Sequence, residues 1–339
     1  MNLISGRRAV LLSLFLAAIG LVLVFVFASA SMLPKPASSA NLLPLVPQRQ
    51  QRYTAIMSAF APEISAVLQG MTVETSRTVM GTTYYFATYP ETPGRHYLVF
   101  QTNVSMVNAA AAVQKTIMLF PLDRLVFSGI AGGVDDRLNI GDVVAPLKWI
   151  EYQENILGRE VSGTYTINPW QYSPFPNYKE RFIAQVDLGS QGPVTWFDVP
   201  QYMIEAARNV SVTLESCTTS NICLEKKPKF FVGGLGGSSQ SFLDNAEFRE
   251  YLWNQVTITN TTPYTYFGEM TTTLHLDVID MESASAAQVC RMNGVDCFFF
   301  RSLSDLAGGG PGENEMNTFF QLAANNSAKV MLAYLKELP

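Results

Sequence analysis

Three carboxylates stand just after predicted strands, where acidic side chains could share acid and base chemistry. Glu63 follows the apolar run 53–60, and Glu282 and Asp305 each follow an apolar run near the C-terminal end of the chain. A set of carboxylates can divide the work, one protonating a leaving group while another activates water. Each acid also has a structural explanation: Glu63 and Glu282 suit the first turn of a helix, and Asp305 suits a turn or an N-cap.

Strands and helices alternate along most of the chain. Predicted strands cover 53–60, 83–89, 95–102, 124–130, 141–153, 229–235, 275–281 and 296–303. Predicted helices cover 62–70, 104–120, 199–209, 245–253, 283–294 and 317–335. This alternation indicates an α/β fold with a largely parallel sheet. The remainder of 155–228 is expected to form long loops.

The position of each acid follows from that fold. The strands 275–281 and 296–303, with the helix between them, should form a parallel β-α-β unit. In open α/β sheets, ligands bind at the carboxyl edge of the strands. Glu63, Glu282 and Asp305 should therefore share one rim, together with the glycine-rich segments that follow two other strands.

The sequence lacks several other catalytic motifs. GGLGGSSQS (233–241) has no Lys-Ser/Thr of a phosphate-binding loop, and AGGVDD (131–136) is not a dinucleotide fingerprint. With two histidines, His96 and His275, an H-E-x-x-H zinc site is excluded, and no G-x-S-x-G elbow occurs. Carboxylates acting without metal or cofactor favour cleavage of a glycosidic bond through an oxocarbenium-like state.

Composition and charge set the broad class. The chain is 48% hydrophobic and 15% charged, which is enough apolar material for a large core. Its net charge is −5 and it has no Lys/Arg cluster, so nucleic-acid binding through a basic patch is not expected. Because no Pro/Gly-rich linker divides 51–339, this segment is predicted to be one catalytic domain.

Residues 1–30 predict a signal peptide or a membrane anchor. Arg7 and Arg8 precede a long apolar run that ends in Ala-Ser-Ala at 28–30, as in a secretory signal. The run is also long enough to span a bilayer, so an uncleaved anchor is the alternative. Residues 31–50 are a Pro-containing linker. Either alternative predicts entry into the secretory pathway and an extracellular or vacuolar location.

The glycosylation sequons and the cysteines are consistent with entry into the secretory pathway. Asn-x-Ser/Thr sequons, which predict a glycoprotein, occur at Asn103, Asn209, Asn260 and Asn325. Cys217 and Cys223 flank a short polar stretch and are candidates for a small loop disulfide. Cys290 and Cys297 lie in apolar sequence and are expected to be buried thiols. The spacing of the four cysteines does not resemble a zinc site.

Two segments carry a resemblance to a known family. GIAGGVDDRLNIGDVV (129–144) and DMESASAAQVCRMNGVDCFFFRSLSDLAG (280–308) resemble the purine nucleoside phosphorylase/uridine phosphorylase superfamily. Within it, the chain is similar to methylthioadenosine/adenosylhomocysteine nucleosidases and to plant bark (vegetative) storage proteins. The resemblance covers most of 51–339, weakly in 155–228. It implies a three-layer α/β/α sandwich with a mixed, largely parallel sheet, usually in a homo-oligomer.

The resemblance implies a role for each acid. Glu63 matches the acid that activates the attacking water, and Asp305 matches the acid that protonates the purine at N7. Glu282, with Met281, matches the pair that holds the ribose hydroxyls. Further substrate-binding positions implied are Phe242, which would stack on the base, and Ile130, Ala131 and Gly132. A proton donor near neutral pH needs a raised pKa, and the apolar run at 298–300 is consistent with burial of Asp305.

The same comparison separates a hydrolase from a phosphorylase. Phosphorylases of this superfamily hold phosphate with an Arg and a Ser, where this chain has Phe127 and Ile130. A dianion without a guanidinium is poorly held, which favours water as the nucleophile. We therefore expect hydrolysis of a purine nucleoside, with or without a 5′ modification, to free base and sugar. An inactive storage or nucleoside-binding protein and a phosphorolytic enzyme are the other hypotheses.

One loop departs from the family pattern. Family members carry glycine where this chain has Asn103, Val104 and Ser105. A glycan on Asn103 would lie beside the site, so that sequon is predicted to be empty.

Overall fold

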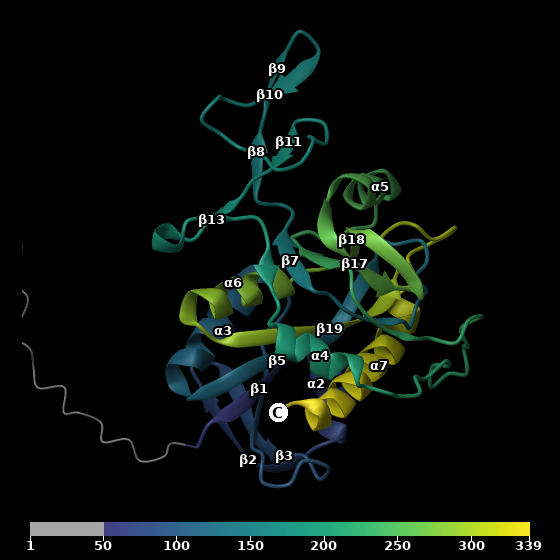
Figure 1. Cartoon of the computed structure of the whole chain (residues 1–339). Helices are drawn as coiled ribbons and strands as arrows, with labels where there is room; N and C mark the ends of the chain where they lie inside the picture. Colours follow the sequence, from purple (N-terminus) through teal and green to yellow (C-terminus); the bar gives the residue numbers. More distant parts are fainter. Residues whose placement is uncertain (1–50) are drawn as a thin grey trace, which may run out of the picture. The chain divides into compact units, whose positions relative to one another are not determined.

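A mixed sheet of thirteen strands organises residues 51–339, which are the residues that the computed structural model describes (Figure 1). Its strands are β1 (Tyr53–Ser58), β2 (Thr72–Val79), β3 (Thr82–Thr88), β4 (Tyr97–Gln101), β5 (Leu122–Gly133), β6 (Val143–Ala145), β7 (Lys148–Glu151), β14 (Phe197–Asp198), β15 (Phe230–Val232), β16 (Leu235–Ser238), β17 (Thr257–Tyr266), β18 (Glu269–Asp280) and β19 (Asp296–Asp305). The main path runs β14-β7-β16-β18-β5-β1-β4-β3-β2, and β19, β6, β15 and β17 join beside it.

The middle of this sheet is parallel. β1 runs parallel to β4 and β5, β5 to β19, and β16 to β7 and β18. Strands covered on both faces need continuous apolar runs, and Phe298, Phe299 and Phe300 of β19 are all fully buried. The predicted α/β fold with a mixed, largely parallel sheet is confirmed.

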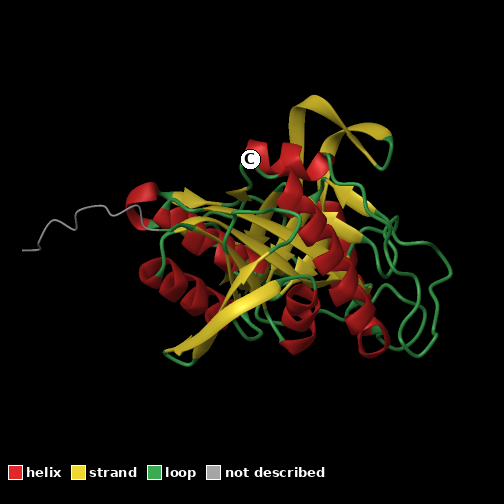
Figure 2. Cartoon of the chain, turned by 90° about the horizontal axis from the view of Figure 1, so that it is seen from below, coloured by secondary structure: helices red, strands yellow, loops and turns green. Residues whose placement is uncertain are grey.

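Helices cover the sheet in two layers (Figure 2). They are α2 (Ala61–Gln69), α3 (Met106–Leu119), α4 (Gln201–Arg208), α5 (Ala246–Gln255), α6 (Ser283–Asn293) and α7 (Met316–Glu337), with a 3₁₀ turn at Gly189–Gln191. Helix α3 packs on α6, which lies on β16 and β7, whereas α2 and α4 pack on α7, which lies on β19 and β5. The sheet therefore lies between two helical layers.

The segment from β7 to α4 forms small hairpins rather than structureless loops. Its strands are β8 (Asn155–Leu157), β9 (Arg159–Val161), β10 (Thr164–Thr166), β11 (Arg181–Ile183), β12 (Val186–Asp187) and β13 (Pro193–Val194). They pair as β8–β11, β9–β10 and β12–β13, apart from the main sheet (Figure 1). The long loops predicted for 155–228 are thus partly hairpins.

The cysteines lie as predicted. Cys217 and Cys223 form a disulfide. Cys290 and Cys297 are free and buried, at the end of α6 and the start of β19.

The strands differ from the predicted ones in three respects. The predicted strand 141–153 is two strands, β6 and β7, because Pro146 between them lacks the N–H that a ladder needs. The glycines 129–133 belong to β5 itself, and Gly236 and Gly237 to β16. β2 and β17 were not predicted, because their sequences, TVETSRTV and TITNTTPYTY, are mostly polar and show no apolar alternation.

The predicted parallel pair 275–281 and 296–303 was also wrong. β5 changes partner along its length: it runs parallel to β19, but its last residues pair antiparallel with β18, with Ile279 opposite Gly132. β18 and β19 therefore both border β5 without pairing with each other. Their carboxyl ends still meet at the end of β5, which preserves the shared rim.

The predictions for residues 1–30 and 31–50 lie outside the described residues, and the secretory location and homo-oligomer stay predictions. Residues 51–339 form one compact unit. Within this unit, no helix combines the length and apolar character needed to cross a membrane.

Candidate active site

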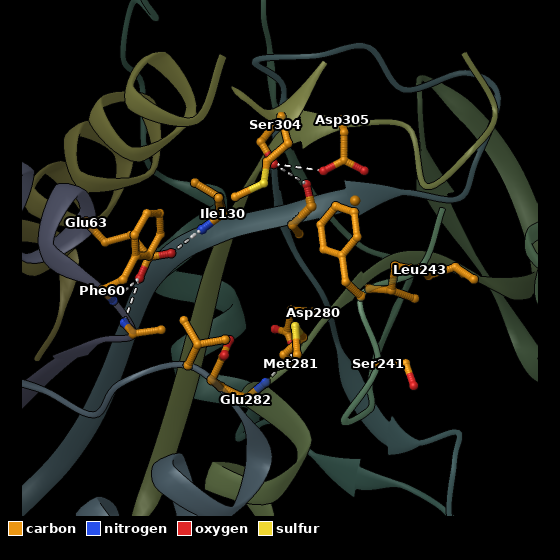
Figure 3. Close-up of a pocket in the computed structure, with 17 residues that line it drawn as sticks. Phe60, Glu63, Ile130, Ser241, Leu243, Asp280, Met281, Glu282, Ser304 and Asp305 are labelled. Carbon is orange, nitrogen blue, oxygen red and sulfur yellow. Dashed lines mark hydrogen bonds between the residues drawn. The ribbon is translucent and has the colours of Figure 1, made fainter. Parts of the chain in front are cut away.

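One cavity opens where the carboxyl ends of β1, β5, β18 and β19 meet (Figure 3). It is lined by Ala59, Phe60, Glu63, Val104, Ile130, Ala131, Gly132, Ser241, Phe242, Leu243, Ile279, Asp280, Met281, Glu282, Ser304, Asp305 and Met316. All eight residues predicted to bind or convert the substrate are in this set. The structure therefore brings together side chains that are far apart in the sequence.

Glu63 is held rigidly at the start of α2. Pro62 in the first helical turn precedes it, and the carboxylate turns back so that Oε2 accepts from the N–H of Ala59 at 2.6 Å and of Phe60 at 3.4 Å. Oε1 accepts from the N–H of Ile130 at 2.7 Å, which ties α2 to β5. The Ile130 side chain lines the cavity while its backbone fixes Glu63.

Glu282 caps the start of α6. Its Oε1 accepts from the N–H of Ser105 at 2.9 Å, and its Oε2 accepts from Nη2 of Arg301 at 3.4 Å. Only 4% of Glu282 is exposed. Ser105 has φ 101° and ψ 150°, and Asn103 has φ 68°. These angles suit glycine and strain other residues, Ser105 most of all.

Arg301 is the residue whose importance sequence reasoning missed, although it stands in the motif that carries the resemblance. Its guanidinium is buried below the cavity and lies 3.6 Å from the ring centroid of Phe127. Its Nε is 2.7 Å from Oδ2 of Asp280, and its Nη1 is 3.9 Å from Oε1 of Glu63. With the contact to Glu282, three buried carboxylates share this one cation.

Burial is the main reason that the pKa of both glutamates is raised. Burial raises the pKa of Glu63 to about 7, against the opposing effects of Arg301 and of three backbone N–H groups. Burial also raises the pKa of Glu282 to about 7; Arg301 opposes this, and the charges of Asp280 and Glu63 add to it. The pair is therefore poised to exchange protons near neutral pH.

Asp305 is the last residue of β19, not the residue after it. Its Oδ1 accepts from the N–H of Ala307 at 2.9 Å, and its Oδ2 accepts from Oγ of Ser304 at 2.9 Å. Burial raises the pKa of Asp305, while these two hydrogen bonds oppose the rise. The apolar run at 298–300 packs elsewhere, with Phe298 and Phe300 against Tyr334. The burial of Asp305 comes instead from close neighbours at the end of β5.

Two glycines of β5 make room for these carboxylates. A Cβ on Gly129 would lie 2.2 Å from Nη1 of Arg301 and 2.7 Å from Oε1 of Glu63. A Cβ on Gly132 would lie 3.1 Å from Oδ1 of Asp305. The glycine-rich segment thus lets charged side chains approach the backbone of β5.

The remaining walls are largely apolar. Phe242 is half exposed at the cavity edge, and Met281, Leu243, Val104 and Met316 line other parts of it. Among the described lining residues there is no Lys, Arg or His. Within residues 51–339, no group of three or more His, Cys, Asp or Glu side chains is arranged to hold a metal ion.

Another buried acid, outside the cavity, gives a stability prediction. Glu151, at the end of β7, is 8% exposed, and its Oε1 has no hydrogen-bond partner. Burial, aided by the charge of Glu154, raises its pKa to about 7 from its ordinary value of 4.5. The folded protein therefore holds this proton longer than the unfolded chain does, and stability falls as pH rises from about 4.5 to 7.

Glu151→Gln is expected to raise the free energy of unfolding by about 2 kcal/mol at pH 8, because the penalty of ionising a buried carboxyl is removed. At pH 5 the gain should be much smaller. Urea denaturation at both pH values measures this. The exposed neighbour substitution Glu154→Gln is the control and should change stability by less than about 0.5 kcal/mol. An equal gain at pH 5 and pH 8 would rule out titration of Glu151 as its cause.

Comparisons with known proteins show which family this chain resembles. The family model of the phosphorylase superfamily matches residues 53–336. A 5′-methylthioadenosine/S-adenosylhomocysteine nucleosidase of Halalkalibacterium halodurans is 24% identical over 285 residues, which cover 84% of this chain and 97% of that protein. An aminodeoxyfutalosine nucleosidase of Campylobacter jejuni is 25% identical over 289 residues, covering 84% and 98%.

Solved structures share the fold. The 5′-methylthioadenosine/S-adenosylhomocysteine nucleosidase of Colwellia psychrerythraea, in complex with adenine, superposes with a TM-score of 0.60 at 22% identity, covering 85% of this chain and 96% of that one. Futalosine hydrolase of Helicobacter pylori gives a TM-score of 0.59 at 18% identity, covering 85% and 99%.

Proposed function

The chain belongs to the phosphorylase superfamily, and we propose that it hydrolyses the N-glycosidic bond of a purine nucleoside. The observation that carries this proposal is that Glu63, Glu282 and Asp305 line one cavity. The names of the relatives, which are nucleosidases, support the same reaction class.

Asp305 would act as the general acid. As the bond between the sugar C1′ and the base nitrogen breaks, a proton passes from Asp305 to N7 of the purine, so that the base leaves neutral. Burial favours the protonated carboxyl that this step needs. Ser304, which donates to Oδ2, orients the carboxyl.

Glu63 and Glu282 would act on the sugar side. Ionised Glu63 accepts a proton from water as the water oxygen bonds to C1′ of the oxocarbenium-like sugar. Glu282 accepts hydrogen bonds from the ribose hydroxyls and adds negative charge near the developing cation. Arg301, behind both, stabilises their ionised forms.

Water is favoured over phosphate as the nucleophile. Phosphate would need a cation facing it, but no Lys, Arg or His is among the described lining residues. Arg301 is 0% exposed and already lies close to three carboxylates. The apolar side chains of Phe60, Val104 and Met316 favour an uncharged 5′ substituent over a phosphate or carboxylate.

The test is base release by the purified full-length protein from adenosine, inosine, methylthioadenosine and adenosine 5′-monophosphate, with and without phosphate. We expect free base and free sugar without phosphate, with kcat/KM at least about tenfold higher for methylthioadenosine than for the monophosphate. Chromatography identifies the base and the sugar product. Release that needs phosphate and yields a sugar phosphate would make the protein a phosphorylase. Absence of release from all four would favour the storage or binding alternative.

A further inference from the structure

Asp280 is a fourth carboxylate at the cavity, outside the proposed chemistry. It is 8% exposed and lies at the end of β18. Its Oδ1 accepts from the N–H groups of Glu282 and Ser283, each at 3.0 Å, and from Oγ of Ser238. These bonds fix the first turn of α6, from which Glu282 projects.

The other oxygen of Asp280 faces Arg301. Oδ2 is 2.7 Å from Nε of Arg301, whereas the guanidinium is 3.4 Å from Glu282 and 3.9 Å from Glu63. The shortest ion pair of the buried cation is thus made with an acid that has no role in breaking the bond. Arg301 therefore stabilises the ionised forms of Glu63 and Glu282 less than it stabilises that of Asp280.

We propose that Asp280 is a positioning residue that holds Arg301 back from Glu63 and Glu282 and so keeps both glutamates able to carry a proton near neutral pH. This inference rests on the proposed hydrolysis for its kinetic consequences. Its structural basis, the shared buried cation, is independent of the substrate.

The charged and titratable groups around Asp280 are few. Arg301 faces it from β19 and Glu282 from the start of α6, whereas Glu63 of α2 lies near Nη1 of the same guanidinium. Tyr152, which directly follows β7, is affected by the charge of Asp280, and burial is the main reason that its pKa is raised. Because Asp280 is the second carboxylate in contact with the same guanidinium as Glu282, removing its charge should favour ionisation of Glu282 directly. Release of Arg301 should favour ionisation of Glu63.

The test is the pH dependence of kcat/KM for Asp280→Asn. Asparagine keeps an oxygen for the three donors of Oδ1 but removes the negative charge that faces Arg301. The acid limb of the profile reports ionisation of the free enzyme's base. We expect its midpoint to fall by about one pH unit, so that the ratio of activity at pH 6 to that at pH 8 rises about five-fold. A merely structural role would lower kcat/KM by the same factor at every pH and leave the midpoint in place.

Two further variants make the result specific. Arg301→Gln removes the cation and should move the acid limb upward, opposite to Asp280→Asn. Glu151→Gln removes a buried carboxylate on β7, which is separated from β18 by β16, and it should leave the midpoint unmoved because Glu151 does not line the cavity. A midpoint that stays in place in Asp280→Asn, or moves as far in Glu151→Gln, would overturn the proposal.

A second measurement separates this inference from the proposed function. ¹³C NMR titration of the glutamate carboxyls, assigned with Glu63→Gln and Glu282→Gln, reports their pKa values without turnover. We expect both values to be lower in Asp280→Asn than in the parent protein. Absence of base release from the parent protein would refute the hydrolase proposal alone, whereas unchanged carboxyl pKa values would refute the role of Asp280.

Discussion

Replacing Asp305 by asparagine is expected to lower kcat/KM for the best purine nucleoside about 10³-fold, with KM changed only a few-fold. Asparagine has nearly the same volume and can still donate a hydrogen bond to N7, but it cannot transfer a proton as the bond breaks. Single-turnover base release in the parent protein and in Asp305→Asn measures the chemical step directly.

The control for this prediction lies close by. Asp244 adds to the rise of the Asp305 pKa through its charge, but it does not line the cavity. Asp244→Asn should therefore keep kcat/KM within about three-fold of the parent value, because a surface charge acts weakly through solvent. Equal base release from Asp305→Asn and the parent protein would exclude Asp305 as the general acid.

The sequence predicted that the three acids share one edge of the sheet, because the carboxyl ends of the strands in an α/β fold meet at one edge whatever the exact pairing. Glu63, Glu282 and Asp305 each stand at the end of a buried run, and the ends of such runs converge in an α/β sheet. That inference survived an error in detail, since β18 and β19 do not pair in parallel as expected. The ends of strands can therefore be located from sequence before their pairing is known.

Sequence reasoning could not foresee how the charges are shared. Arg301 lies within an apolar strand, and nothing in the spacing shows that its guanidinium reaches three carboxylates from three different elements. Asp280 precedes the Met-Glu pair and shows no pattern of its own. Such contacts depend on tertiary geometry at the scale of a few ångströms, which hydrophobic periodicity does not encode.

Hydrophobic periodicity also did not show where strands break, although Pro146 was a signal for one of these breaks. Pro146 divides the predicted strand 141–153, and a proline inside a strand is a reason to expect such a break. The hairpins between β7 and α4 lack this kind of signal because their strands are two or three residues long. Strands that short bury too little to produce a recognisable alternation.

Replacing Glu63 by glutamine is expected to slow hydrolysis for a different reason, lowering kcat/KM about 10³-fold while nucleoside binding changes little. In the proposed mechanism ionised Glu63 is the base, so activity in the parent protein should fall as pH drops below about 7, the raised pKa of this group. The residual activity of Glu63→Gln should lack this acid limb, because no carboxylate remains there to be protonated. Calorimetric titration with the nucleoside and a pH series of base release measure the two effects.

Measuring nucleoside binding and base release separately distinguishes an enzyme from a binding protein. The amide must turn its NH₂ group toward the N–H of Ile130 or toward those of Ala59 and Phe60, so thermal unfolding must show that Glu63→Gln is folded. A binding protein that had lost turnover would bind equally well with either side chain and release no base with either. An acid limb that persisted in Glu63→Gln would assign the base to Glu282, the other carboxylate with a pKa of about 7 at the same cation. In the proposed mechanism, the protonation states of Glu63 and Glu282, rather than the shape of the cavity, thus determine whether the bound nucleoside is cleaved.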